Sequence, residues 1–161
     1  MNVEEVPISS LIPYEFNNRT HSEEQVNRIA NSIKQFGFNQ PIVIDENNLI
    51  IVGHGRWLAA NKLNLAKVPV VKKTGLTETL KKAYRILDNK LQNDSTWQFN
   101  NLELELGALE DAGFDLPEWG LDTIIPTLED LEEKEESKEK EPRLIECPEC
   151  KHKFDVNDCS E

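Results

Sequence analysis

The most regular hydrophobic pattern in the chain follows Ser22. Apolar side chains recur there at the three- and four-residue spacing of a helix with one buried face: Val26, Ile29, Ala30, Ile33 and Phe36. Ser22-Glu23-Glu24-Gln25 is typical of a capping box, in which the serine hydroxyl and the glutamine side chain satisfy backbone N–H groups at the helix start. Gly37 suits the left-handed conformation that ends many helices. The pattern therefore predicts a helix from about residue 22 to residue 37.

Short apolar runs after this helix predict strands. Residues 41–44 and 49–52 flank the turn-forming residues 45–48, which favours a pair of strands. The second run leads into a glycine-rich turn, Gly53-His54-Gly55-Arg56, and residues 57–63 then favour a helix. Residues 68–71 are a further short strand, in which Pro69 suits an edge of the sheet better than its centre.

Two more helices are expected towards the C-terminus. Thr77 suits the N-cap of a long helix that reaches about Asn93. Its apolar residues fall on one stripe: Leu80, Ala83, Tyr84, Leu87 and Leu91. Residues 101–112 form another short amphipathic helix, which Gly113 ends. Residues 129–141 hold eight acidic residues, three lysines and one leucine, so they are either a linker or a frayed, highly charged helix.

Charge divides the 161 residues into two parts. Residues 1–100 carry 12 Lys/Arg and 10 Asp/Glu, net +2, whereas residues 101–161 carry 6 and 20, net −14. Between Arg56 and Lys90 there are nine basic residues against two acidic ones, so this segment could face phosphates. Ordinary solvated lysines on helix faces are the alternative. No 18-residue apolar run or signal-peptide layout is present, which predicts a soluble cytoplasmic protein with no membrane partner.

The turn at Gly53–Arg56 carries the clearest candidate chemistry. Glycines let an anion approach the backbone amides, and the N-terminus of the following helix adds a favourable dipole. Arg56 would add a charged, two-pronged contact to a phosphate. A tight turn with a purely structural role is the alternative reading of these four residues.

Several segments, in order and at the expected spacing, resemble the ParB/sulfiredoxin superfamily. They are residues 8–14, 17–26, 30–43, 52–60, 68–70 and 83–90. Similarity is greatest to the ParB-like N-terminal domain often joined to phage and bacterial DNA methyltransferases. The resemblance implies an α/β (α+β) fold over residues 1–122, with a small mixed sheet flanked by helices and C-terminal helices after it. We expect an acidic linker over residues 123–143 and a separate tail over residues 144–161.

In chromosome-partitioning ParB proteins the matching motif is Gly-Glu-Arg-Arg, which binds the triphosphate of CTP. Gly53 and Arg56 match it, while His54 and Gly55 replace the middle residues, so the resemblance implies a bound CTP or ATP, with Mg²⁺ as a further expectation. Sulfiredoxin has a cysteine where this chain has His54, which excludes reduction of a sulfinic acid through that thiol. No helix-turn-helix domain follows residue 122, so site-specific partition binding is not expected.

Two further motifs of the superfamily extend this nucleotide site. Asn17, Arg19 and His21 fall in the pattern Asn-x-Arg-x-His-Ser and would present polar groups beside the phosphate turn. Asp88-Asn89 resembles the acidic-Asn pair that closes on the nucleotide in partition proteins. The alternatives are hydrogen bonding within the loop for the first motif, and polar positions opposite Leu87 and Leu91 for the second.

A branch of the superfamily with the turn Gly-His-x-Arg phosphorylates free serine and uses a catalytic glutamate from its N-terminal segment. Glu15 lies where such a base could stand, and a kinase needs positioned phosphates plus a carboxylate that takes the hydroxyl proton. His54 could contact a phosphate or act in acid/base chemistry. The alternatives are an ordinary surface glutamate and a histidine that only caps the helix.

All three cysteines lie in the last fifteen residues. Cys147-Pro-Glu-Cys150, followed by His152, resembles half of a zinc ribbon, and Cys159 adds a third thiolate. A complete zinc site then needs His152 or a ligand from another chain, and an unmetallated, reducible tail is the alternative. A shared site would make the protein a homodimer.

Three classes of function compete on this sequence. We expect a nucleotide- and DNA-associated accessory protein of a phage or mobile-element DNA modification system, with DNA or a DNA-modification enzyme as partner. A kinase acting on a hydroxyl of a small molecule or a modified base is the second class. A ParB-like nuclease is the third, although residues 1–100 show no clustered acidic metal constellation.

Overall fold

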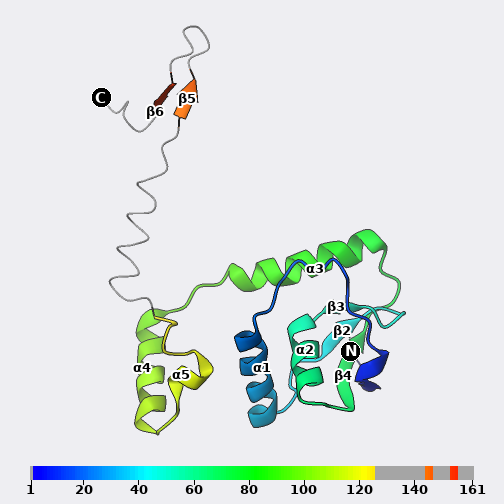
Figure 1. Ribbon diagram of the computed structural model, residues 1–161, viewed down its shortest axis with the longest axis horizontal. Coiled ribbons are helices and arrows are strands. Elements are labelled where there is room, and N and C mark those ends of the chain that lie inside the picture. Colours follow the sequence, from blue (N-terminus) through cyan, green and yellow to red (C-terminus); the bar gives the residue numbers. More distant parts are fainter. Residues whose placement is uncertain (1, 126–143, 147–152, 156–161) are drawn as a thin grey trace. The chain divides into compact units, whose positions relative to one another are not determined.

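A computed structural model describes residues 2–125, 144–146 and 153–155 (Figure 1). The chain forms two compact units, Met1–Leu102 and Glu103–Glu161, and each is described by itself. The first unit contains, in chain order, β1 (Val3–Pro7), the 3₁₀ turn η1 (Ile8–Ser10), α1 (Glu23–Phe36), β2 (Ile42–Ile44), β3 (Ile50–Val52), α2 (His54–Lys62), β4 (Lys67–Lys72) and α3 (Glu78–Asn93). The predicted small mixed sheet with flanking helices is confirmed.

The sheet has the strand order β1-β4-β2-β3. β4 is antiparallel to β1 and parallel to β2, and β2 and β3 form the predicted antiparallel pair. Placing Pro69 at an edge was wrong, because β4 lies between two strands. The pairing with β2 begins only at Val70, opposite Ile42, so Pro69 faces a strand on one side, where its partner is Glu5. Its missing N–H therefore costs no bond to β2.

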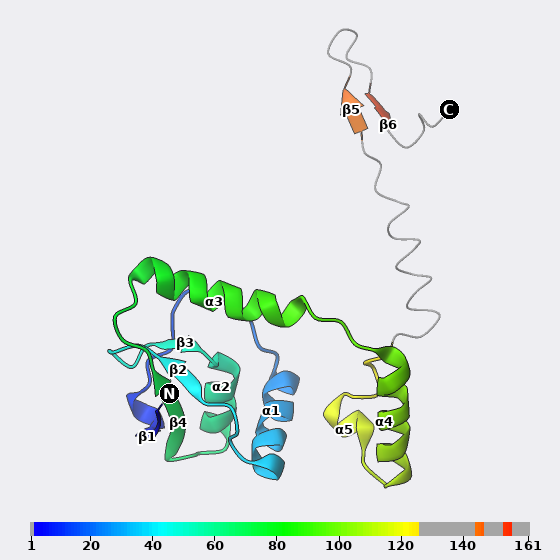
Figure 2. The same cartoon turned by 180° about the vertical axis from the view of Figure 1, so that it is seen from behind.

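The core lies where this sheet meets α2 and η1. Its buried members are Leu11, Ile42, Ile44, Ile50, Ala60, Val68 and Val70. Helices α1 and α2 pack side by side, as both views of the chain show (Figure 2). The first turn of α2 and the C-terminal end of β3 are thereby fixed next to the N-terminal end of α1.

Glycine and serine set the helix starts and ends in this unit. The Ser22 hydroxyl accepts a hydrogen bond from the Gln25 N–H at 3.2 Å, and Gly37 ends α1 at φ 85°. The capping box is only half formed, because the Gln25 side chain bonds the ring of His21 at 3.0 Å. Helix α2 begins at His54, earlier than the predicted 57–63, because Gly53 adopts φ 103° and serves as its N-cap.

Helix α3 turns its polar side towards the domain. Thr77 caps it as predicted, and the helix packs against β3. Lys81 and Arg85, one helical turn apart, are only 2% and 3% exposed, whereas Leu87 and Leu91 are 54% and 65% exposed. The apolar stripe of α3 is therefore largely on the outside, which the sequence pattern did not indicate.

The buried ammonium of Lys81 is held by three carboxylates. Its Nζ lies 2.8 Å from Asp45, 3.2 Å from Glu46 and 3.1 Å from Glu78. Hydrogen bonds to Asp45 first, then to Glu78 and Glu46, raise the pKa of Lys81 despite its burial. Burial pushes the pKa of Asp45 upward, but hydrogen bonds from Lys81 and from the Leu49 and Asn47 N–H groups outweigh it and lower that pKa. This network ties the start of α3 to the turn between β2 and β3.

The predicted helix is α4 (Phe99–Asp111), within which the boundary between the two units falls, and the short α5 (Leu116–Trp119) follows it in the second unit. Phe114 stacks on Trp119 with ring centroids 5.7 Å apart. Strands β5 (Leu144–Glu146) and β6 (Lys153–Asp155) pair antiparallel. Among the residues described, none of the helices has the length and apolar character needed to span a bilayer.

Candidate nucleotide-binding site

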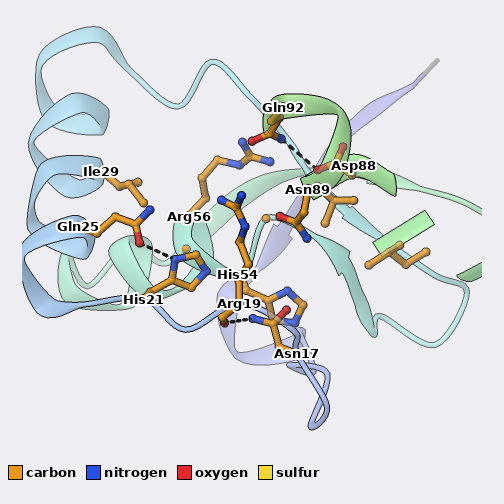
Figure 3. Close-up of a pocket in the computed structure, with 14 residues that line it drawn as sticks. Asn17, Arg19, His21, Gln25, Ile29, His54, Arg56, Asp88, Asn89 and Gln92 are labelled. Atoms are coloured by element: carbon orange, nitrogen blue, oxygen red, sulfur yellow. Dashed lines mark hydrogen bonds between the residues drawn. The ribbon is translucent and has the colours of Figure 1, made fainter. Parts of the chain in front are cut away.

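One cavity of about 160 Å³ gathers residues from three segments that are far apart in the sequence (Figure 3). All nine residues predicted to bind phosphate or nucleotide line it: Asn17, Arg19, His21, Gly53, His54, Gly55, Arg56, Asp88 and Asn89. The first three come from the loop before α1, the next four from the start of α2, and the last two from α3. Glu15 is exposed and is not among the lining residues. Gln25 and Gln92, which were not predicted, are.

Gly53 allows the side chain of Arg56 to fold back over the turn. A Cβ at Gly53 would lie 3.1 Å from Nη2 of Arg56 and 3.4 Å from Cγ1 of Ile42, and φ 103° would strain any other residue. The first helical bond of α2 runs from the Trp57 N–H to the Gly53 carbonyl. The N–H groups of the three residues between them are therefore not used within the helix and can face an anion.

Gly55 allows the loop before α1 to come close to the same turn. A Cβ there would meet Cε1 of His21 and Cδ1 of Ile29, each at 3.1 Å. Nδ1 of His21 lies 3.0 Å from Oε1 of Gln25. An amide oxygen only accepts, so Nδ1 carries the proton.

Arg56 has donor capacity left over. Its Nη1 donates to Oε1 of Gln40 at 2.6 Å, but its buried Nε has no hydrogen-bond partner among the described residues. Burial lowers the pKa of Arg56 and the charge of Asp88 raises it. Because arginine remains charged at any physiological pH, the side chain brings a cation to the cavity that it lines.

Arg19 reaches into the cavity from the opposite side. Figure 3 shows its side chain, with those of Arg56 and Asn89, extending towards the space between the turn and α3. Nη2 of Arg19 donates to Oδ1 of Asn93 at 3.0 Å, and the Arg19 carbonyl accepts from Nδ2 of Asn17 at 2.7 Å. Two guanidinium groups thus face a small polar space, which favours an anionic occupant.

His54 is held as a neutral donor. Its Nε2 accepts the Tyr14 N–H at 3.1 Å, so a neutral ring carries its proton on Nδ1. Burial, and then the charges of Arg85 and His21, lower the pKa of His54 to about 4. With one nitrogen occupied and protonation disfavoured, His54 is better suited to donating a hydrogen bond than to acting as a base.

Arg85 does not line this cavity, but it acts on His54, which does. Its guanidinium carbon lies 3.7 Å from the centroid of the Tyr14 ring, and its charge acts on His54. Nε, Nη1 and Nη2 are buried and have no hydrogen-bond partner within the described part of the chain. Sequence reasoning missed this residue, because an arginine on an amphipathic helix is ordinarily solvated.

A second cavity, of about 550 Å³, adjoins the first. Gln25, Ile29 and Arg56 line both, and the second continues along α1 to residues 37–40. In residues 2–125, 144–146 and 153–155 there is no group of three His, Cys, Asp or Glu side chains placed to hold a metal ion. The predicted zinc ligands Cys147, Cys150, His152 and Cys159, and most of the predicted acidic linker, lie outside the described residues.

Comparison with known proteins identifies the family to which this mixed sheet and its helices belong. The ParB N-terminal domain matches residues 1–89, more than half of the chain, and the chain belongs to that family. The predicted place in the ParB/sulfiredoxin superfamily is thereby confirmed.

Individual relatives agree with this assignment. The chain is 51% identical over 75 residues to the ParB-like nuclease domain-containing protein YnaK of Escherichia coli (strain K12), covering 47% of this chain and 86% of that protein. It is 31% identical over 116 residues to a nucleoid occlusion protein of Bacillus pumilus (strain SAFR-032), covering 68% of this chain but only 36% of that protein.

A solved structure shares the fold. The C-terminally truncated chromosome-partitioning protein ParB from Caulobacter crescentus, complexed with CTP-gamma-S, superposes with a TM-score of 0.60. The match is 23% identical and covers 73% of this chain and 68% of that one. This chain is therefore a ParB-like domain related to partitioning and nucleoid occlusion proteins.

Proposed function

We propose that this protein binds a nucleoside triphosphate, CTP or ATP, with its phosphates at the turn Gly53–Arg56. The observation that carries the proposal is the convergence on one cavity of the N–H groups at the start of α2 that the helix does not use and the side chains of Arg56 and Arg19. The ParB relative complexed with CTP-gamma-S supports it. The cavity of about 160 Å³ at Gly53–Arg56, here called the phosphate cavity, is too small for a whole nucleotide. The larger cavity that shares Arg56 provides the remaining room.

We further propose that the protein associates with DNA, as the partitioning and nucleoid occlusion proteins to which it is related suggest. Its basic residues are concentrated before residue 100, where they can neutralise phosphates. We also propose a role as an accessory of a phage or mobile-element modification system, with Mg²⁺ bound beside the nucleotide. The cysteine pattern of residues 147–159 supports zinc in the tail, and a zinc site shared by two chains would make the protein a homodimer.

Calorimetric titration with CTP, ATP and ADP, with and without duplex DNA, tests nucleotide binding. Arg56→Ala should weaken nucleotide affinity by 1.5–3 kcal/mol, on the order of 10- to 100-fold, because a charge-assisted contact is lost. Lys34→Ala removes an equally charged, exposed residue outside both cavities and should leave affinity unchanged. If the wild type binds none of the three nucleotides, or the Arg56 variant binds as tightly as wild type, the proposed site is wrong.

The same samples separate a binding module from an enzyme. A binding module gives saturable heat without product, whereas a kinase releases ADP in the presence of a hydroxyl acceptor and a nuclease cleaves DNA when a divalent metal is added. We expect no turnover, because Glu15 does not line the cavity and the Nε2 lone pair of His54 is occupied by the Tyr14 N–H. Sustained ADP release from the wild type that Glu15→Gln abolishes would contradict this expectation.

A further inference from the structure

The guanidinium of Arg85 is buried without a hydrogen-bond acceptor among the described residues, which is rare in proteins. It has five N–H donors, and its Nε, Nη1 and Nη2 lack an acceptor among the described residues. The face of the Tyr14 ring, 3.7 Å away, gives an attractive contact but accepts none of the in-plane hydrogen bonds. A buried cation without acceptors destabilises the fold, and each such group calls for an explanation.

Lys81 shows that this helix can satisfy a buried cation fully. It lies one helical turn before Arg85, is equally buried, and contacts the carboxylates of Asp45, Glu46 and Glu78. Within the described residues no carboxylate forms an ion pair with Arg85, although Asp88 is three residues away on the same helix and acts on Arg56. The donors of Arg85 are thus left available for an acceptor that no described residue supplies.

The position of Arg85 indicates where that acceptor enters. Of the residues that line the cavity at Gly53–Arg56, His54 is close enough for the charge of Arg85 to act on its ring, and Asn89 lies one helical turn after Arg85 on α3. Tyr14 covers the guanidinium with its ring and occupies His54 with its N–H. One residue of the N-terminal loop thus covers both polar groups.

We propose that Arg85 is a second anion-binding residue, which takes a phosphate oxygen of the ligand when Tyr14 moves away from the guanidinium and from His54. This anion-binding role rests on the proposed function, because the anion is taken to be a phosphate of the nucleotide bound at Gly53–Arg56. A planar guanidinium pairs with two oxygens of one phosphate, which matches the unused donors of Arg85. Nε2 of His54 is released by the same movement.

The first test combines affinity with stability. Arg85→Met keeps a long apolar stem and removes the unpartnered charge, so nucleotide triphosphate affinity should fall at least 10-fold while the melting temperature is unchanged or higher. Lys81→Met, the matched control, should lower the melting temperature, because it leaves the buried carboxylate of Asp45 without its cation. Unchanged affinity in the Arg85 variant would overturn the proposal, and so would a loss of affinity that merely follows a lowered melting temperature.

A second variant and a second probe keep the test decisive. Arg85→Lys retains the charge without the planar fork and should show an intermediate loss of affinity; wild-type affinity in this variant would overturn the proposal even if Arg85→Met fails to fold. Inorganic phosphate serves as a ligand with no nucleoside. It should raise the melting temperature of the wild type and of Arg56→Ala, and do so less in Arg85→Met.

The two probes distinguish the two failures. If nucleotides do not bind but phosphate stabilises Arg56→Ala more than Arg85→Met, the proposed function fails and the anion site at Arg85 stands. If nucleotides bind, and Arg56→Ala weakens their affinity whereas Arg85→Met does not, then the proposed function stands and this inference fails.

Discussion

Two cations on one helix meet opposite conditions. At the start of α3, Lys81 is enclosed by three carboxylates, and its contacts with Asp45 and Glu46 join this helix to the turn between β2 and β3. One turn later, Arg85 lies against Tyr14 and beside His54 with its donors unused among the described residues. Burial is the same at both positions, at 2% and 3% exposure. The difference indicates that Lys81 supports the structure, and it is the basis for our proposal that Arg85 binds an anion.

The glycines and the histidine at the cavity also suit the binding of an anion better than a purely structural role. Gly53 and Gly55 are needed for close approach of Arg56 and His21 to the turn, so the backbone there is shaped to fit side chains that carry polar groups. His54 is kept neutral beside two other basic groups. A site that holds two arginines and a neutral histidine donor around a small space can receive negative charge without first deprotonating the histidine.

The largest expected effect on stability comes from removing a carboxylate partner of Lys81, which leaves that cation closer to the condition of Arg85. Asp45→Ala removes an ion pair and the acceptor for the Asn47 and Leu49 N–H groups, and should lower the free energy of unfolding by about 3 kcal/mol or more. Urea unfolding at pH 7 measures it. Nucleotide affinity of the folded variant should stay as in wild type, because Asp45 does not line the cavity.

Asp94→Ala is the matched control for that variant. Asp94 pairs with Lys90 on the exposed side of α3, and its loss should change the free energy of unfolding by less than about 0.5 kcal/mol. Equal destabilisation by the two aspartate variants would show that the buried network is no more important than a surface pair.

Acidification should have a smaller effect on the free energy of unfolding. This effect tests the surroundings of Arg85, because the charge of Arg85 acts on His54. The folded pKa of His54, about 4, is below its ordinary value of 6.5, so the unfolded chain binds a proton in this range that the folded chain does not. Stability should therefore fall as the pH drops from 6.5 towards 4, by about 2 kcal/mol between pH 7 and pH 4.5. The lowered pKa of Asp45 makes its contribution fade only below its ordinary value of 3.8, outside this window.

Denaturant unfolding of His54→Gln at the two pH values isolates this contribution. The glutamine Oε1 can accept the Tyr14 N–H in place of Nε2 but does not titrate. The variant should lose less stability on acidification than the wild type does. Parallel losses in the two proteins would mean that His54 titrates normally and that Arg85 and burial do not act on it as described.

Much of the fold could be predicted from the sequence, because local chemistry specifies it. The apolar spacing after Ser22, the glycine at residue 37 and the turn at residues 45–48 each correspond to an observed helix end or strand pair. The superfamily motifs predicted nine of the fourteen residues that line one cavity, because each motif fixes both a backbone conformation and a polar side chain.

The features that were missed depend on partners distant in the sequence. Strand β1 has two glutamates among its five residues and gains its place only by pairing with β4. A helical pattern shows that α3 has an apolar stripe, but not that the turn at Asp45 would draw its opposite, polar side inward. Nothing in a sequence distinguishes an arginine with an acceptor from one without, so Arg85 became visible only in three dimensions.

The central claim is that the cavity at Gly53–Arg56 binds through phosphate, and a paired calorimetric titration tests it most directly. CTP and ATP should bind saturably to the wild type, whereas cytidine and adenosine at the same concentrations should give at least 100-fold weaker binding, since the charge-assisted contacts are made to the phosphates. Comparable affinities for nucleoside and nucleotide, or no saturable binding of either triphosphate, would contradict the account.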